Sequence, residues 1–225
     1  MLTGAGISAE SGLKTFRDSG GLWESFRIED VASPEAWHED PELVLDFYNM
    51  RRSQLTEVEP NPAHRFLAEL ESDWAVSIIT QNVDDLHERG GSTSILHLHG
   101  ELRKVRSTGN PSFIQDIGYE VLELGQLCPE GHQLRPHIVW FGEPVPMMDE
   151  AQFITQRADV FLIIGTSLNV YPAAGLIHAT SQDTPILVVD PDPSLQRLAG
   201  DRIQVLTSNA TEALTSLGKI LNGLS

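Results

Sequence analysis

The chain has 225 residues, of which 40% are hydrophobic, and its 32 acidic and 15 basic residues give a formal net charge of −17. This length is enough for one full α/β core and a small appended module. So acidic a chain is not expected to bind nucleic acid, because phosphate binding requires clustered Lys and Arg. The same charge is compatible with lysine-rich protein partners, and equally with an acidic surface that only keeps the protein in solution.

The sequence also bears on cellular location. No run reaches the roughly 18 apolar residues of a membrane span, and the first residues lack the basic, apolar pattern of a signal peptide. The one cysteine, Cys128, excludes an intramolecular disulfide and suits a reducing compartment. We therefore expect a cytoplasmic protein that does not bind membranes. We also expect a monomer, although the sequence does not determine the oligomeric state.

The first predicted element is a glycine-rich turn. Gly4 and Gly6, followed by Ala9, have the G-x-G-x-x-G/A spacing of a turn that receives a dinucleotide pyrophosphate. Gly4 permits a tight turn, Gly6 lets backbone N–H groups approach phosphates, and the N-terminus of the following helix faces the anion. The spacing alone also describes an ordinary turn. Because only three residues precede it, its strand is either stunted or shortened at the chain start, and the sequence leaves both readings open.

The next segments are expected to be a cover and two helices. Residues 18–31, which include Trp23, are interpreted as a mobile cover over the cofactor. Asp40 and Pro41 provide an N-cap and a proline at the first helical position, which predicts a helix to about residue 55. Asn61 and Pro62 predict a second helix to about residue 72 in the same way.

Short apolar runs predict the strands. Residues 75–80, 160–164 and 186–189 read as buried parallel strands, residues 95–100 as a further strand, and residues 138–141 as extended. Residues 103–136 read as a loop-rich module, and residues 211–221 as a closing helix. This alternation predicts an α/β fold, with a doubly wound, mostly parallel, Rossmann-like sheet and a smaller helical and loop-rich domain. The expected division is an NAD-binding domain of residues 1–30, 74–102 and 137–225, and a small domain of residues 31–73 and 103–136.

Polar residues follow several predicted strands, where ligands bind in such sheets. Gln81, Asn82 and Asp84 offer two amides and a carboxylate that can bond ribose hydroxyls and a carboxamide, although a polar turn with a helix cap is an alternative. The sequence Gly165-Thr166-Ser167 ends another strand. Asp190 ends the next and could accept from ribose hydroxyls, which would disfavour a 2′-phosphate and favour NAD over NADP.

His99 is the candidate general base. It lies at a predicted strand end beside Gly100, where its ring can face a cleft, and an imidazole with a pKa near neutrality suits proton transfer. Most of the eight histidines are expected to be surface or capping residues, and His97 is expected to be structural.

Tyr48 and Arg51 are three residues apart on the predicted helix and share a face with Val44 and Leu55. An Arg within an apolar stripe is costly unless something pairs with it. It could snorkel to water or meet a protein carboxylate. Alternatively, the guanidinium could receive a substrate carboxylate, with the tyrosine hydroxyl as a further donor.

Five motifs together resemble the sirtuins, the NAD-dependent protein lysine deacylases. Residues 3–17 are similar to the family pattern GAGxSxxSGIPxFR, with Leu13 and Lys14 in place of Ile and Pro, a change typical of the bacterial branch that removes acidic acyl groups. The other motifs are residues 81–84, 99–100, 140–143 and 165–167. The Tyr48/Arg51 pair resembles that of desuccinylating and demalonylating sirtuins.

The resemblance implies transfer of an acyl group from acyl-lysine proteins or peptides to ADP-ribose, with release of nicotinamide. It implies that His99 is the general base, that Asp84 and Val83 meet the nicotinamide, and that Asn82 and Gln81 serve the ribose and the reaction centre. The residues expected at the cofactor are Gly4, Ala5, Gly6, Ser8, Ser11, Thr15, Phe16, Arg17, Trp23, Gln81, Asn82, Val83, Asp84, Gly165, Thr166, Ser167, Asp190, Pro191, Asp192 and Ala210. The residues expected at the substrate are Tyr48, Arg51, Val139, Trp140, Phe141 and Gly142.

The clearest departure from the family concerns metal. Sirtuins generally hold a structural zinc on four cysteines, whereas this chain offers only Cys128, with His132 and His137 nearby and Ser107 about where the first cysteine is expected. We therefore expect no zinc. The module should then be held by packing, through the apolar and aromatic residues Phe113, Ile114, Ile117 and Tyr119.

Two other functions stay open. One is an NAD glycohydrolase or ADP-ribosyltransferase on the same fold, for which the Tyr48/Arg51 pair has no obvious purpose. The other is a catalytically silent NAD-sensing module, which would not need the base His99.

Overall fold

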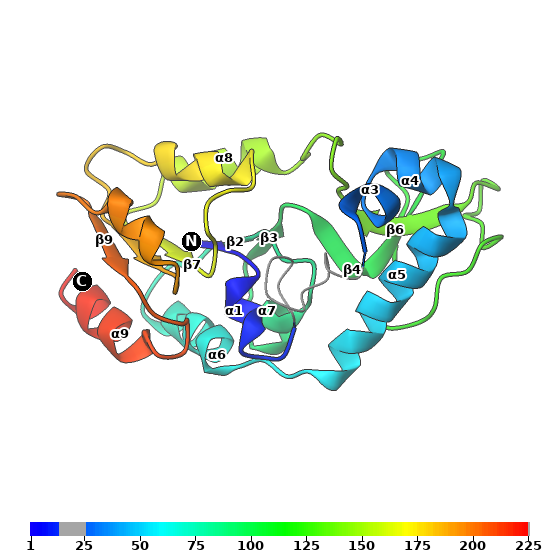
Figure 1. Ribbon diagram of the computed structural model, residues 1–225. Coiled ribbons are helices and arrows are strands. Elements are labelled where there is room, and N and C mark those ends of the chain that lie inside the picture. Colours follow the sequence, from blue (N-terminus) through cyan, green and yellow to red (C-terminus); the bar gives the residue numbers. More distant parts are fainter. Residues whose placement is uncertain (14–25, 225) are drawn as a thin grey trace.

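The computed structural model describes residues 1–13 and 26–224 and has two parts (Figure 1). The larger part is built on a six-stranded sheet whose strands pair in parallel in the order β3-β2-β1-β7-β8-β9. Its strands are β1 (Leu2–Thr3), β2 (Ile78–Thr80), β3 (Ile95–His97), β7 (Phe161–Ile164), β8 (Ile186–Val189) and β9 (Ile203–Leu206). The predicted doubly wound α/β sheet is confirmed.

The strand order reverses at β1. From this strand the chain builds outward to β2 and β3 on one side, and later to β7, β8 and β9 on the other. Leu2 is accordingly paired with Ile79 of β2 and with Ile163 of β7. In open sheets of this type, ligands bind at the carboxyl ends of the strands beside such a reversal.

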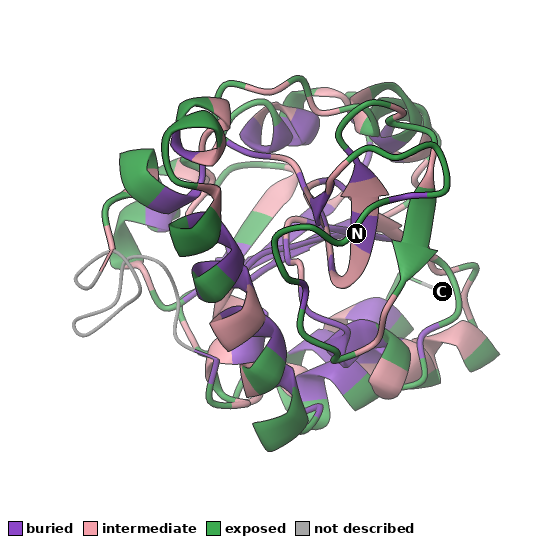
Figure 2. Ribbon diagram, turned by 90° about the vertical axis from the view of Figure 1, so that its right-hand side faces the viewer, coloured by how far each residue is buried: buried purple, intermediate pink, exposed green. Residues whose placement is uncertain are grey.

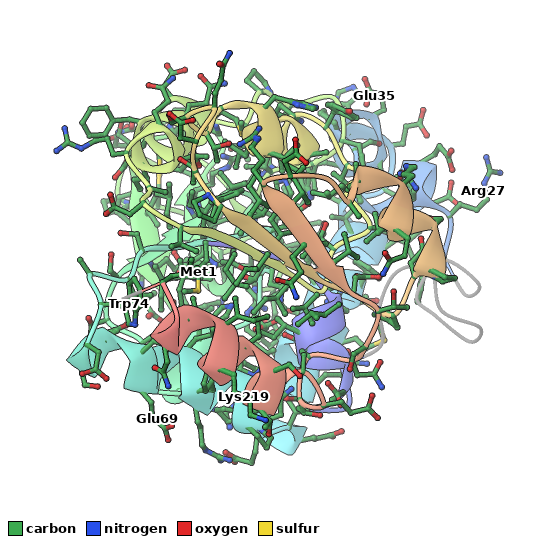
Figure 3. All side chains as sticks on the ribbon, turned by 90° about the vertical axis from the view of Figure 1, so that its left-hand side faces the viewer. Met1, Arg27, Glu35, Glu69, Trp74 and Lys219 are labelled. Atoms are coloured by element: carbon green, nitrogen blue, oxygen red, sulfur yellow. The ribbon has the colours of Figure 1, made fainter. Side chains whose placement is uncertain are left out.

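Both faces of the sheet are buried, which explains the continuous apolar strands. Phe161 and Ile163 of β7 join one apolar cluster, whereas Leu162 and Ile164 join the opposite one. The helices on the first face are α8 (Met148–Gln156) and η3 (Ala173–His178), and those on the second are α6 (Pro62–Glu69) and α9 (Leu214–Asn222) (Figure 1). Charged side chains such as Glu69 and Lys219 are exposed on the outer helices (Figure 3).

Among the described residues, the larger part also contains four shorter helical segments: α1 (Gly6–Ala9), η2 (Leu70–Ser72), α7 (Leu86–Arg89) and η4 (Pro193–Leu198). Across the described residues, no helix combines the length and the apolar character needed to cross a lipid bilayer.

The smaller part has, in the portion of the chain that the structure describes, four helical segments: α3 (Ile28–Val31), α4 (Pro34–Glu39), α5 (Pro41–Gln54) and η1 (Leu55–Glu57). The start of α5 is the predicted one, because Asp40 Oδ1 accepts a 3.0 Å hydrogen bond from Leu43 N. Asn61 caps α6 similarly, with its side chain accepting from Ala63 N. Buried residues line one side of α5 and exposed residues the other (Figure 2), as expected for an amphipathic helix.

Two strand expectations need correction. Residues 75–77 precede β2 and are not part of it. The run 95–100 is broken after His97, because Gly100 has φ +82 and begins a different strand. The segment 103–136 is loop-rich as expected, because most of its residues lie outside strands, but it also contributes to a second sheet. Its strands, β4 (Gly100–Ser107), β5 (Ile114–Asp116) and β6 (Leu134–Ile138), form an antiparallel sheet in the order β5-β4-β6.

The core of this small antiparallel module differs from the expected one. Phe113 and Ile117 do pack against it, but Ile114 and Tyr119 are 46% and 40% exposed, so their expected packing role is wrong. The cluster itself is formed by α5 and the module, through Leu45, Val105, Leu122, Cys128 and Leu134.

Candidate active site

Two glycine turns interlock at the reversal point of the sheet. Gly6 N donates a 2.8 Å hydrogen bond to Gly165 O, across the ends of β1 and β7. A Cβ atom on Gly4 or Gly6 would lie 2.7 Å from atoms of the opposite turn, and one on Gly165 would lie 2.3 Å from Ile7 N. The glycines are therefore needed for the contact between the two turns. Their interlock leaves backbone and small side chains at the strand ends, an arrangement that fits a dinucleotide.

The loop after β2 carries the predicted polar residues to the same edge. Gln81 Nε2 donates to Thr166 Oγ1 at 3.0 Å, which links this loop to the β7 turn. Asn82 Nδ2 donates to Ser8 Oγ at 3.0 Å, and Ser8 Oγ donates to Asp84 Oδ2 at 3.0 Å. The structure thus brings together the predicted residues of α1, of the β2 loop and of the β7 turn.

His99 has the geometry of a base. Its Nδ1 lies 2.9 Å from the carbonyl oxygen of Gln81, so this nitrogen carries the hydrogen and Nε2 holds the lone pair. Burial lowers the pKa of His99, although the Gln81 carbonyl acts in the opposite direction. The imidazole is therefore neutral near pH 7 and can accept a proton at Nε2.

His64 was not predicted at this site. Its Nδ1 accepts from Asn61 N at 3.3 Å, so Nε2 carries the hydrogen and lies 3.5 Å from Ser8 Oγ. Burial lowers the pKa of His64 to about 4. A neutral histidine thus supports Ser8, whose hydroxyl is turned towards Asp84. Burial in turn raises the pKa of Asp84, against hydrogen bonds from Leu86 and Ser8.

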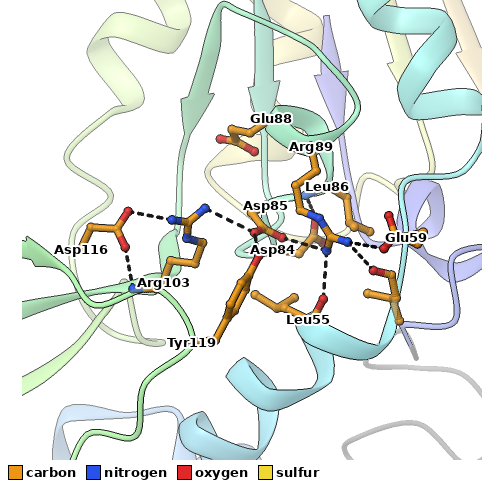
Figure 4. A network of polar contacts seen from close by, with 12 residues as sticks. Leu55, Glu59, Asp84, Asp85, Leu86, Glu88, Arg89, Arg103, Asp116 and Tyr119 are labelled. Atoms are coloured by element: carbon orange, nitrogen blue, oxygen red, sulfur yellow. Dashed lines mark hydrogen bonds and ion pairs between the residues drawn. The ribbon is translucent and has the colours of Figure 1, made fainter.

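A second polar network lies next to Asp84 (Figure 4). Tyr119 Oη donates to Asp85 Oδ2 at 2.6 Å, and Arg89 lies 3.6 Å from the same carboxylate group. Arg89 also donates to the backbone carbonyls of Leu55 and Val58. This network joins the antiparallel module and the end of α5 to the loop that carries Asp84.

The end of β8 reaches the same edge of the sheet. Asp190 is 8% exposed, and its Oδ1 accepts from Asp192 N at 2.9 Å. Burial raises the pKa of Asp190. The side chain of Asp192 caps η4 by accepting from Ser194 N, and Pro191 between them is exposed. The side chain of Ala210 is buried in the core, so any ligand contact of this residue would use its backbone.

Tyr48 and Arg51 are buried on the inner side of α5, at 5% and 7% exposure. Tyr48 Oη accepts a 3.0 Å hydrogen bond from Trp140 Nε1. Burial lowers the pKa of Arg51, and the neighbouring Tyr48 and Asp84 act against that shift. The pair thus lies in an apolar setting, against the cluster that contains Val44, Leu55 and Trp140.

The expected substrate strand follows β6. Val139 N donates to His99 O at 2.9 Å, so this segment runs beside the candidate base. The Trp140 side chain is buried, whereas Phe141 is 52% exposed and its N donates to Ala32 O. Gly142 has φ +91 with open space around it.

The remaining residues expected at the cofactor have few side-chain contacts in the structure or lie outside its described part. Thr15, Phe16, Arg17, Trp23 and residues 18–25 of the expected cover lie outside the described residues. Ala5 precedes α1 as its N-cap residue. Val83 O accepts from Leu102 N, and Ser167 lies in the β7 turn. Ser11 Oγ is buried and has no hydrogen-bond partner among the described residues.

The position expected for zinc ligands holds a hydrogen-bonded pair. The Cys128 thiol donates to Ser107 Oγ at 3.3 Å, and Ser107 Oγ also accepts from the N–H groups of Gly109 and Asn110. Since the sequence contains no other cysteine, a four-cysteine zinc set is absent. The residues present do not fit that metal site.

Within the described part of the chain, one other group of side chains is close enough to hold a cation: Glu88, His97 and Glu101. These groups are already paired. His97 Nε2 lies 2.8 Å from Glu88 Oε1, and Glu101 is 2.6 Å from Lys104 Nζ. His97 Nδ1 also lies 3.0 Å from Asn82 O. We assign no metal there.

The sheet order, the interlocked glycine turns and the polar side chains gathered beside them define a dinucleotide-binding protein of the Rossmann-like class. A model of the Sir2 family matches residues 4–172. The chain belongs to the Sir2 family.

Known proteins are similar over nearly the whole length. An NAD-dependent protein deacylase of Bacteroides thetaiotaomicron is 51% identical over 226 residues, covering 98% of this chain and 96% of the relative. A solved Sir2 homologue–NAD complex superposes with a TM-score of 0.87 at 40% identity, covering 100% and 89% of the two chains. A Sir2 complex with deacetylated p53 peptide and 3′-O-acetyl ADP-ribose gives a TM-score of 0.79 at 26% identity, covering 97% and 91%.

Proposed function

We propose that this protein is an NAD-dependent protein lysine deacylase that removes acetyl groups and, with preference, acidic acyl groups such as succinyl and malonyl. The observation that carries the activity is the position of His99. Its Nδ1 is bound to the Gln81 carbonyl at 2.9 Å, which leaves Nε2 as a neutral base at the carboxyl edge of the sheet. NAD, when bound, supplies the ADP-ribose that accepts the acyl group and the nicotinamide that leaves.

The protein residues bind and orient the reactants. The two glycine turns, after β1 and after β7, can bind the phosphates, and the Asp190 carboxylate can accept hydrogen bonds from the adenosine ribose. Asn82 and Asp84, held by Ser8, suit the nicotinamide ribose and carboxamide. His99 Nε2 accepts a proton from a ribose hydroxyl, which makes that oxygen the acceptor for the acyl group.

Tyr48 and Arg51 support the acidic preference. An acyl carboxylate that enters an apolar channel loses its hydration, and only a matched cation offsets that cost. Arg51 keeps its charge at physiological pH and offers a fork of donors, and Tyr48 adds a neutral donor one turn away on α5. An acetyl group lacks the carboxylate and gains nothing from this pair.

We propose acyl-lysine proteins or peptides as substrates, a monomeric enzyme and a cytoplasmic location. The negative net charge suits lysine-rich substrates, and the single cysteine suits a reducing compartment.

The test compares acetyl-lysine and succinyl-lysine forms of one peptide, incubated with the protein with and without NAD and followed by mass spectrometry. We expect acyl loss from both only with NAD, and faster loss from the succinyl form. If neither peptide changes, the proposed activity is wrong. If the acetyl peptide alone reacts, the activity stands and the acidic preference is wrong.

A further inference from the structure

The hydrogen bond between Trp140 and Tyr48 has a fixed direction. The indole Nε1–H can only donate, whereas a tyrosine hydroxyl can donate and accept. The 3.0 Å contact is therefore a bond from Trp140 Nε1 to Tyr48 Oη, and it uses the accepting side of the hydroxyl. Within the described residues this is the only hydrogen bond of the Tyr48 side chain, so the hydroxyl hydrogen is left to point elsewhere.

The indole itself is held rigidly. The guanidinium carbon of Arg135 lies 3.2 Å from the centre of the Trp140 ring, and the Trp37 ring lies 5.8 Å away. The backbone N–H of Trp140 donates to Glu143 Oε2 at 2.8 Å. The side chain is 2% exposed. The donor that faces Tyr48 is thus fixed before any substrate arrives.

The guanidinium beside the indole is already paired with a carboxylate. Arg135 Nη1 donates to Glu143 Oε1 at 2.7 Å, and Nη2 donates to Glu143 Oε2 at 3.1 Å. Arg106 reaches the same carboxylate at 3.1 Å. Arg135 therefore braces the ring face and is not the group that would receive an acyl carboxylate.

We propose that Trp140 is a positioning residue for acyl selectivity: its indole N–H occupies the accepting side of the Tyr48 hydroxyl, so that the hydroxyl is presented as a donor to an acidic acyl group. This inference rests on the proposed acidic preference. A carboxylate is purely an acceptor, so it matches a hydroxyl held in this way. A hydrogen bond accepted by Oη also polarises the O–H and strengthens its donation. Burial raises the pKa of Tyr48, so the hydroxyl keeps its proton.

The test uses Trp140→Phe, which keeps an aromatic ring and removes the N–H donor. The readout is the ratio of kcat/KM for succinyl-lysine and acetyl-lysine forms of one peptide. We expect the ratio to fall about 2- to 13-fold, the range for the loss of one hydrogen bond between neutral groups. Trp37→Phe is the matched control, because it also removes an indole N–H but keeps an aromatic ring against Trp140; it should leave the ratio unchanged.

A double-mutant cycle separates positioning from packing. In a Tyr48→Phe background, Trp140→Phe should lower the ratio no further, since the hydroxyl on which it acts is absent. A merely structural Trp140 would lower both activities together and leave the ratio intact, which would overturn the inference. If the wild type shows no preference for succinyl-lysine, the proposed acidic preference itself is wrong. If the wild type shows the preference and Trp140→Phe does not change the ratio, only the role proposed for Trp140 is wrong.

A solution measurement covers the case in which Trp140→Phe does not fold. The chain has four tryptophans, so the ¹⁵N–¹H spectrum of the wild type contains few indole N–H signals. Replacing each of the other three tryptophans by Phe removes its signal and so identifies the signal of Trp140. The Trp140 signal should shift in Tyr48→Phe and on addition of succinyl-lysine peptide, and less with acetyl-lysine peptide. An indole signal equally insensitive to both peptides would contradict the proposal.

Discussion

Arg52 of α5 donates a 2.6 Å hydrogen bond from Nε to the backbone carbonyl of Leu102 in β4. The side chain is 1% exposed, and its Nη1 donates to Asn49 Oδ1 at 2.7 Å. Asn49 in turn pairs with the backbone of Leu122 through both its amide nitrogen and its oxygen. Side chains of α5 thus fasten the antiparallel module to the rest of the protein without cysteine ligands.

Arg52→Met should therefore destabilise the protein. The change keeps much of the apolar stem but leaves the buried Leu102 carbonyl without its side-chain donor and removes one of the two hydrogen bonds to Asn49 Oδ1, so we expect the free energy of unfolding to fall by about 2–4 kcal/mol. Urea unfolding measures it. Arg157→Met is the control, because Arg157 is exposed and its change should stay within about 0.5 kcal/mol. Equal small effects of both changes would show that Arg52 does not anchor the module.

The purified protein should contain no stoichiometric zinc, and chelators should not unfold it. Three of the four cysteine ligands are missing, and the Cys128 thiol is hydrogen-bonded to Ser107. Elemental analysis and thermal unfolding with a chelator check this. About one zinc per chain, together with unfolding in chelator, would contradict it.

Arg51→Met should separate the two acyl activities. The substitution keeps the apolar bulk of the stem and removes the guanidinium, so a succinyl carboxylate would be buried without a cation. Desuccinylation should then lose roughly 2–5 kcal/mol in kcat/KM, and the ratio of desuccinylation to deacetylation should fall accordingly. Parallel losses of both activities would mean that Arg51 has a structural role.

His99→Ala should lower the deacylation rate by about 10²- to 10⁴-fold, the usual contribution of a general base, with NAD binding largely retained. In the wild type, burial lowers the pKa of His99 below its ordinary 6.5. Because the base must be neutral, kcat/KM should rise as pH increases through that lowered pKa. A variant that turns over normally would show that His99 is not the base. A wild-type kcat/KM that falls on acidification with a midpoint above pH 6.5 would contradict the lowered pKa of His99.

The elements that sequence patterns predicted well are those whose pattern is purely local. β7 and β8 are buried on both faces and read as unbroken apolar runs, and α5 and α6 begin with an N-cap and a proline. In contrast, β4 alternates buried and partly buried residues and is rich in charge, and β9 is only partly buried. Because neither strand forms an unbroken apolar run, periodicity alone does not reveal them.

The same contrast holds at the site. Gln81, Asn82 and Asp84 follow a recognisable strand, and a parallel sheet brings such ends together. His64 was missed because its contact with Ser8 joins positions 56 residues apart. The signal that could have found it is local: His64 stands at the third position after Asn61 and completes a capping box with it.

The stoichiometry of nicotinamide release tests the central claim most directly. In reactions that contain the protein, NAD and a succinyl-lysine peptide, chromatography and mass spectrometry would count nicotinamide, deacylated peptide and acyl-ADP-ribose. A deacylase should release one nicotinamide for each acyl group removed, with the acyl group recovered on ADP-ribose, and should release little without peptide. Nicotinamide released at the same rate whether or not acylated peptide is present would instead indicate an NAD glycohydrolase and contradict the proposed function.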